Sequence, residues 1–215
     1  MGRKPKNEQK DTCGQILDAA QTLFAEKGFD ATGVNEIARN AGITKSVIYY
    51  HFKNKNQILE TLFEQFVQFT MEGEKQYNEQ RFGDSRNQDV GEMISAWFKS
   101  NREDLQKWKR MCRIVLMEAA KKNGRSDLLF RIFEENLKLS EKHYGDKLQE
   151  GAREVGGKAF FMSFFWWALP GFALFALEDE WAKRYNTNVE SVREMFIECS
   201  GDLFTAIMKS NYWHI

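Results

Sequence analysis

Apolar residues recur at three- and four-residue spacing along most of this chain, which is the pattern of amphipathic helices. The first such stretch covers about residues 10–27, and Gly28 follows it as the glycine expected after a helix end. Strand-like alternation is hard to find, and the only prolines are Pro5 and Pro170. The pattern therefore predicts an all-α fold.

Residues 34–52 predict two short helices joined by a tight turn. The first has Thr32 as its expected N-cap and ends at Gly42, because glycine reverses the chain without a Cβ penalty. The second begins at Lys45, with Thr44 as its N-cap, and reads KSVIYYHF. Its outward positions carry a lysine, a serine, two tyrosines and a histidine but no carboxylate, which suits a helix that enters the major groove of DNA. Two helices joined at a glycine also occur in all-α proteins that bind no DNA.

The spacing Asn54-x-x-Gln57 has the form of a capping box and predicts a long helix that starts at Lys55. This helix is too long for a small three-helix unit, so it should leave the first core and enter a second one. We therefore expect two domains: residues 1–54 with the helix-turn-helix, and residues 55–215 as a larger α-helical unit.

Residues 159–177 form an almost uninterrupted apolar run that is long enough on paper to span a bilayer. Pro170 and Gly171 should break its middle, and no basic flank supports insertion, so we predict a buried helix and no membrane span. We expect the helices near 158–178 and 189–208 to form a two-fold, four-helix interface between two copies. Packing of these helices within one chain is the alternative.

Charge is distributed unevenly, although Lys and Arg balance Asp and Glu over the whole chain. Residues 1–57 hold nine basic against six acidic side chains, while the remainder holds 22 against 25. The basic residues before position 11 form either an arm for phosphates or a solvated tail.

The cysteine and histidine content argues against a disulfide framework or a metal site. Three cysteines are widely spaced, and none of the three histidines is paired at metal-ligand spacing. No apolar segment follows the basic N-terminus, which argues against a secretory signal. We expect a cytoplasmic protein that needs no cofactor.

The segment from Ile16 to Leu59 contains AAQTLFAEKGFDATGVNEIA, then AGI, then IYYHFKNKNQIL, and it resembles the DNA-binding domain of the TetR family of bacterial repressors. This resemblance covers roughly the first quarter of the chain. It implies an all-α homodimer in which each subunit has a three-helix reader domain and a C-terminal ligand-binding and dimerising domain. Such proteins usually repress an operon until an effector binds.

The resemblance also implies roles for residues at matching positions of the reader helix. Residues at its start would contact bases or nearby backbone, and three later positions would contact phosphates. Ser46 stands where many members have glycine, which makes the base preference harder to infer. The predicted DNA-binding residues are Thr32, Thr44, Lys45, Ser46, Val47, Tyr49, Tyr50, His51 and Lys55.

Aromatic and methionine side chains in the C-terminal region predict a pocket for a small hydrophobic effector, because both give adaptable contact with flat molecules. For any one of them, a place in the ordinary core is the simpler interpretation. The predicted ligand-binding residues are Phe63, Phe66, Trp97, Trp108, Met111, Phe133, Phe165 and Trp166.

These features together predict a homodimeric repressor that binds a double-stranded DNA operator and is released by the effector. Its reader helices would sit in successive major grooves about 34–36 Å apart, so a ligand that tilts the long helix from Lys55 would misplace them. One alternative is control by a protein partner or by oxidation of Cys112. Another is an all-α carrier or enzyme for hydrophobic molecules, but we find no arrangement of catalytic residues, and we expect a non-enzyme.

Overall fold

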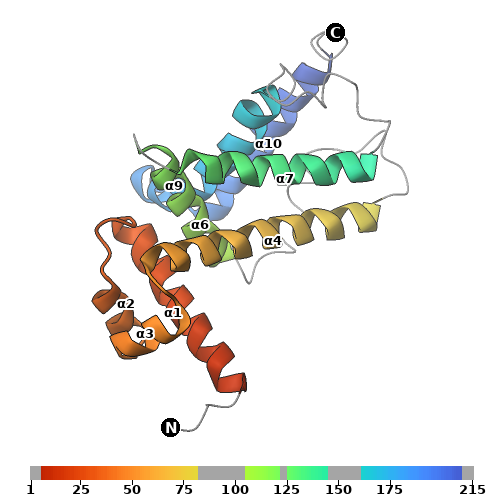
Figure 1. The fold of residues 1–215 in the computed structure, drawn as a ribbon. Helices are drawn as coiled ribbons and strands as arrows, with labels where there is room; N and C mark the ends of the chain where they lie inside the picture. The colour runs from red at the N-terminus through yellow and green to blue at the C-terminus, as the bar shows by residue number, and fades with distance from the viewer. Residues whose placement is uncertain (1–5, 82–104, 122–124, 145–160, 210–215) are drawn as a thin grey trace.

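The computed structural model describes residues 6–81, 105–121, 125–144 and 161–209, and the structural statements below concern these residues. Every described element is helical, so the expected all-α fold is confirmed (Figure 1). The elements in chain order are α1 (Lys6–Lys27), α2 (Val34–Asn40), α3 (Lys45–His51), α4 (Lys55–Arg81), α6 (Leu105–Ala119), α7 (Ser126–Tyr144), the π-helical η3 (Ser163–Ala168), α9 (Leu169–Arg184) and α10 (Val189–Lys209).

The first three helices pack around a small apolar core. Ile16 and Phe24 of α1 bury their side chains against Ile37 of α2 and Ile48 of α3. The turn between α2 and α3 has Gly42 at φ +66°, a conformation in which glycine avoids the steric penalty of a Cβ. The predicted helix-turn-helix is therefore present, with helix ends within a few residues of those expected.

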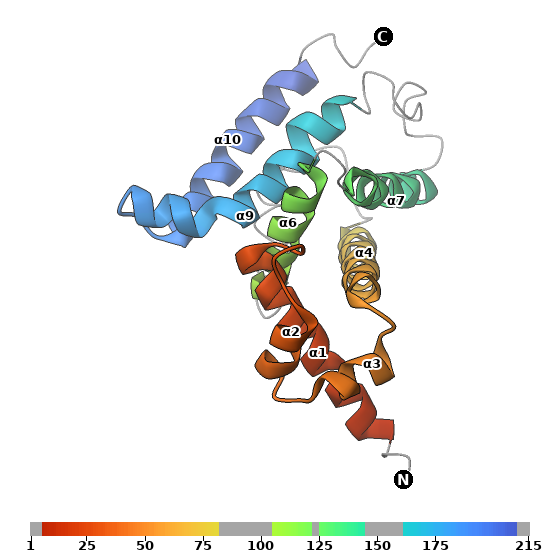
Figure 2. The same ribbon diagram turned by 60° about the vertical axis from the view of Figure 1, so that its left-hand side comes forward.

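Helix α4 connects the two parts of the molecule, as its length predicted. Its first turns place Ile58 and Leu59 in the core shared with α1. Farther along, Phe66 lies 4.7 Å from Trp108 of α6 and 6.1 Å from Phe172 of α9, measured between ring centroids. In Figure 2, α6 lies between the pair α4 and α7 on one side and the pair α9 and α10 on the other.

The predicted capping residues have three different outcomes. At the start of α4, Asn54 Oδ1 accepts from the Gln57 N–H at 2.9 Å, as a capping box requires, whereas Gln57 Oε1 accepts at 2.6 Å from the N–H of Lys53, one residue before the N-cap. Thr44 occupies the N-cap position of α3, but its hydroxyl pairs with the Ser46 hydroxyl at 2.8 Å instead of the helix backbone.

Thr32 is not the N-cap of α2, contrary to prediction, because Gly33 holds that position. The Thr32 hydroxyl donates to the carbonyls of Gly28 at 2.9 Å and Leu23 at 3.3 Å, and the residue is buried. A buried hydroxyl that closes the end of α1 cannot reach DNA, so this predicted DNA contact is wrong.

The apolar run does not break at Pro170, which corrects a second expectation. Residues 161–184 are helical throughout, and the wide π-helical turn η3 immediately precedes α9. A π-helical turn shifts the hydrogen-bond register, which accommodates a proline that has no N–H to donate. Among the described residues, no helix is both long enough and apolar enough to cross a membrane.

Candidate DNA interface and effector pocket

Helix α3 presents polar and aromatic side chains to solvent at the end of the molecule that holds the N-terminus (Figure 1). Ile48 anchors it in the core, whereas Tyr49 is 48% exposed and Tyr50 is 69% exposed. Lys45 is also exposed, and its ammonium lies 5.6 Å from the centroid of the Tyr49 ring. The helix contains no acidic residue from Lys45 to His51, so nothing on it repels a phosphate backbone.

The two ends of α3 differ in how they can meet DNA. Thr44 and Ser46 are exposed at its start, where their paired hydroxyls allow close approach to base edges. Val47 and His51 are half-buried, and the His51 ring meets the edge of Tyr50 at 5.1 Å between centroids. The exposed side chains expected to contact DNA therefore do share one surface.

The ammonium of Lys55, which was predicted to contact phosphate, is bonded inside the protein. Its ammonium donates to the carbonyls of Phe29 at 2.6 Å and Thr32 at 2.8 Å, and it lies 4.2 Å from the centroid of the Phe29 ring. Burial lowers the pKa of Lys55, while the nearby Asp30 acts in the opposite direction. This lysine fixes the loop between α1 and α2 to the start of α4.

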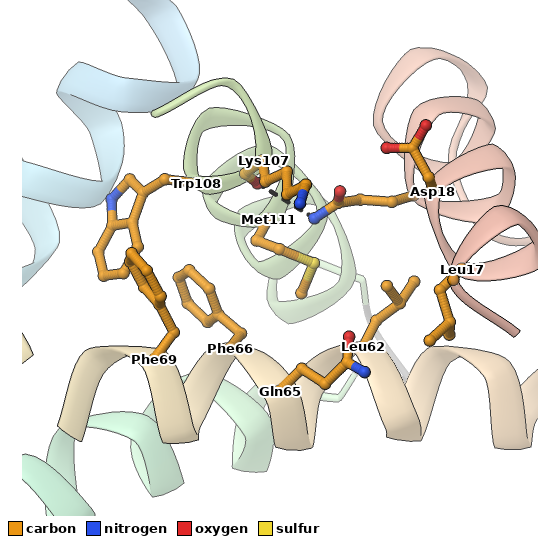
Figure 3. Close-up of a pocket in the computed structure, with 11 residues that line it drawn as sticks. Leu17, Asp18, Leu62, Gln65, Phe66, Phe69, Lys107, Trp108 and Met111 are labelled. Atoms are coloured by element: carbon orange, nitrogen blue, oxygen red, sulfur yellow. Dashed lines mark hydrogen bonds between the residues drawn. The ribbon is translucent and has the colours of Figure 1, made fainter. Parts of the chain in front are cut away.

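A cavity of about 580 Å³ lies between α1, α4 and α6 (Figure 3). Its size is within the range of sites that hold drug-sized molecules. Three predicted ligand-binding residues, Phe66, Trp108 and Met111, line it. The sequence analysis missed the other lining residues, which are Gly14, Leu17, Asp18, Gln21, Leu62, Gln65, Phe69 and Lys107.

Four of the remaining predicted ligand residues lie among the described residues and do not line this cavity. Phe63 is fully buried in the core, and Phe133 packs against Phe164 with ring centroids 5.3 Å apart. Phe165 and Trp166 are about half exposed on the surface. Trp97 lies outside the described residues. The first four predictions are therefore wrong for this cavity.

Polar side chains on the rim of the cavity also join α1 to α6. Gln21 Nε2 donates to the Lys107 carbonyl at 3.1 Å. The Arg110 guanidinium donates to Asp18 Oδ1 at 2.8 Å and to the Thr22 hydroxyl at 2.6 Å. Asp18, Gln21 and Lys107 also line the cavity. The same side chains can therefore contact a molecule in the cavity and hold α1 against α6.

A second junction lies at the end of α6, around the buried carboxylate of Glu118. Glu118 accepts from Lys121 and, at 2.9 Å, from Arg125. Lys121 also donates to Asp30 at 2.6 Å, and the Arg125 guanidinium lies 4.4 Å from the centroid of the Phe29 ring. The loop between α1 and α2 is thus tied electrostatically to the C-terminal helices.

Helices η3, α9 and α10 expose large apolar side chains. Leu177 and Trp181 on α9 and Tyr185 at its C-cap follow one another at four-residue spacing, each more than half exposed. On α10, Met195 and Leu203 are exposed two helical turns apart. Large apolar side chains that gather on one surface are typical of a protein interaction site.

Neither a redox sensor nor a metal site is supported by the described residues. Cys112 is 1% exposed, and burial raises the pKa of its thiol well above the usual value, with Glu178 adding to the shift. A buried, protonated thiol reacts slowly with oxidants. Within the described ranges, no three His, Cys, Asp or Glu side chains are grouped as metal ligands would be.

Comparison with known sequences identifies the N-terminal part. The family described as "Bacterial regulatory proteins, tetR family" matches residues 16–62. The transcriptional regulator AcrR of Shigella flexneri is 42% identical over 64 residues, which are 30% of this chain and 30% of AcrR. The match therefore spans only about 30% of the length of this relative.

Comparison with solved structures covers nearly all of the chain. The fatty acid degradation regulator FadR from Bacillus halodurans matches with a TM-score of 0.58 and 18% identity, over 94% of this chain and 96% of FadR. SmeT in its complex with triclosan matches with a TM-score of 0.55 and 21% identity, over 88% and 90%. At these identities the likeness establishes the fold. Residues 16–62 thus match the tetR family of bacterial regulatory proteins, and the described helices share the fold of FadR and SmeT.

Proposed function

We propose that this protein is a homodimeric repressor that binds a palindromic operator and is released by a small apolar or aromatic effector. The observation that carries the proposal is helix α3, which joins an apolar anchor at Ile48 to exposed Lys45, Ser46, Tyr49 and Tyr50. Lysine and tyrosine hydroxyls suit phosphates, and the short side chains at the helix start suit base edges. The tetR-family match over the same residues supports this role.

The exposed apolar side chains of α9 and α10 support a two-fold dimer. A second copy that packs the same helices against Leu177, Trp181 and Met195 would remove this surface from water. Two reader helices would then occupy successive major grooves about 34–36 Å apart, which explains why the operator should be palindromic.

The cavity and one structure of similar fold support the proposal that a small effector binds. Rings of Phe66, Phe69 and Trp108 line the cavity, and a structure of similar fold, SmeT, was solved with triclosan. Ligand and operator would oppose each other through one coupling free energy, typically about 1–3 kcal/mol. Control by Cys112 oxidation is disfavoured by the burial of its thiol.

The test of DNA binding starts with duplexes enriched from a random pool on the purified protein. We expect a palindrome to emerge, and we expect its affinity, measured by fluorescence anisotropy, to fall steeply as salt rises. Tyr49→Ala and Lys45→Ala should each weaken binding, whereas Lys183→Ala on α9 should not. Absence of any enriched sequence, with both α3 variants behaving like wild type, would refute the proposal.

A further inference from the structure

We propose that the cavity between α1, α4 and α6 binds an uncharged, planar aromatic molecule that touches the DNA-binding domain directly and loosens α1 from α6. This inference rests on the proposed function, because it assumes that α1 positions the reader helix. It goes further by placing the ligand between the two domains and by naming its chemical class.

The aromatic side chains of the cavity favour a flat ligand. The Trp108 ring lies 4.7 Å from Phe66 and 5.4 Å from Phe69, measured between centroids. Figure 3 shows these three rings grouped on one side, with Leu17 and Leu62 on the opposite side. Rings stack best on other rings, while aliphatic side chains accept the flat face of an aromatic molecule through dispersion contacts.

The charges around the cavity favour a neutral ligand with a hydrogen-bonding group. Asp18 and Lys107 carry opposite charges on its rim, and Asp18 is already matched by Arg110. A charged ligand would give up part of its hydration against the largely apolar walls of this half-open cavity, which is costly. The amides of Gln21 and Gln65 offer hydrogen bonds to a polar edge of a neutral molecule.

The location of the cavity connects ligand binding to the reader helix. Gln21 is 5% exposed, and its amide donates to the Lys107 carbonyl across the junction of α1 and α6. A ligand whose polar edge takes up the Gln21 amide, and whose ring fills the space beside it, competes with this bond between the domains. Helix α1 supplies Ile16 and Phe24 to the core that holds α3, so movement of α1 moves the reader helix.

Gly14 provides a direct way to close the cavity. It lies on α1 at the cavity wall, and a Cβ at this position would meet nothing within 4 Å. Gly14→Phe therefore adds a ring in open space, and Gly14→Ala is the matched control that gains helix propensity without filling the cavity. Phe69→Ala is a second variant, which removes one ring and does not depend on Gly14.

The probe is Nile red, a neutral planar dye whose fluorescence rises in apolar surroundings. We expect saturable binding to the wild type and to Gly14→Ala, and an affinity at least about tenfold weaker in Gly14→Phe and in Phe69→Ala. An anionic naphthalene sulfonate should bind more weakly than Nile red. Equal Nile red affinity in all four proteins, or stronger binding of the anion, would overturn the assignment.

The second measurement is operator affinity with and without saturating Nile red. The dye should weaken operator binding by about tenfold in the wild type and in Gly14→Ala but not in Gly14→Phe. If the dye binds in the cavity and leaves operator affinity unchanged, the proposed loosening of α1 is wrong while the repressor assignment stands. If the apo protein selects no DNA, the proposed function itself fails. Thermal melting of each variant confirms that it folds.

Discussion

The N-terminal helices and the C-terminal helices differ in which side chains they expose to water and which they bury. In the former, the only large apolar side chains exposed among the described residues are Tyr49 and Tyr50, each with a hydroxyl at its tip. In the latter, the buried residues include three charged ones, Lys109, Glu118 and Glu178. The exposed large hydrophobic side chains of the C-terminal helices are Phe130, Phe161, Phe165, Trp166, Leu177, Trp181, Tyr185, Met195 and Leu203.

This difference indicates what each region meets. A core that is nearly all apolar, under a polar surface, is complete within one chain and can face water or DNA. The C-terminal region buries charged side chains in ion pairs and exposes large apolar side chains. Such a region is expected to complete its packing against another molecule. We infer that its buried charges hold the helices in one arrangement and add little net stability themselves.

The largest expected effect tests the buried charges directly. Glu178 accepts from Lys109 at 2.7 Å and from Arg193 Nε at 2.8 Å, and its side chain is fully buried. Glu178→Ala would remove both hydrogen bonds that Arg193 makes to Glu178 and would leave Lys109 paired only with the more exposed Asp179, so we expect a loss of about 3–5 kcal/mol in the free energy of unfolding. The exposed Glu180 pairs with Arg113, and Glu180→Ala should cost only about 0–1 kcal/mol.

Urea unfolding followed by circular dichroism measures both changes at a fixed protein concentration. The concentration must match because association with a second copy would itself stabilise the folded chain. Equal effects of the two substitutions would contradict the view that Glu178 fixes the packing of α6, α9 and α10.

The second prediction tests whether a second copy of the chain covers the exposed apolar side chains of α9 and α10. Trp181→Arg puts a charge in the middle of the α9 stripe, and we expect the dimer dissociation constant to rise by about 100-fold or more. Sedimentation velocity should show monomers at micromolar concentration, and operator affinity should fall with the loss of the second half-site. Tyr50→Arg, at the more exposed aromatic of the other domain, should leave the dimer intact. A dimeric Trp181→Arg protein would place the interface elsewhere.

Periodicity was sufficient to predict the helices and the position of α3. The spacing of apolar residues places Ile37 and Ile48 in one core, and the capping box at Asn54 is visible in the letters alone. Such features are local, because a residue three or four positions away decides them. The match to the tetR family covers this same region.

Several differences between the predicted and the observed sites depend on contacts between distant segments. Lys55 looks like a free lysine at a helix start, but the loop at Phe29 folds back onto its ammonium. Phe66 and Phe165 are indistinguishable as aromatic residues of apolar stretches, yet one lines the cavity and the other is exposed. Gln21 lines the cavity because α1 packs against α6, and no pattern within α1 reveals this contact.

A third prediction separates two lysines that look alike in sequence. Lys55→Met removes the hydrogen bonds from the ammonium to the carbonyls of Phe29, Asp30 and Thr32, so we expect a loss of about 1–3 kcal/mol in unfolding free energy. The salt dependence of operator binding should not change. Lys45→Ala should leave stability nearly unchanged and lower the salt slope by about one. If Lys55→Met lowered the salt slope and left stability unchanged, Lys55 would be a phosphate contact after all.

The smallest effect concerns the ionic link between the two regions. Asp30, in the loop after α1, accepts from Lys121 at 2.6 Å, and this hydrogen bond is the main cause that lowers the pKa of Asp30 below its ordinary value of 3.8. A lowered folded-state pKa means that the carboxylate stabilises the fold above pH 3.8 and loses this contribution as pH falls through the folded-state value.

Asp30→Asn should therefore lower the urea midpoint slightly at neutral pH, and the difference from wild type should vanish in acid. Because Asp30 is fully exposed, high salt should shrink the difference as well. Glu26→Gln, at an exposed position near the end of helix α1, serves as the control for removing one surface carboxylate. A difference that persists below the folded-state pKa would show that Asp30 contributes through something other than its charge. The link between the loop and Lys121 would then be a steric contact, and the two regions would be held together at this point by packing alone.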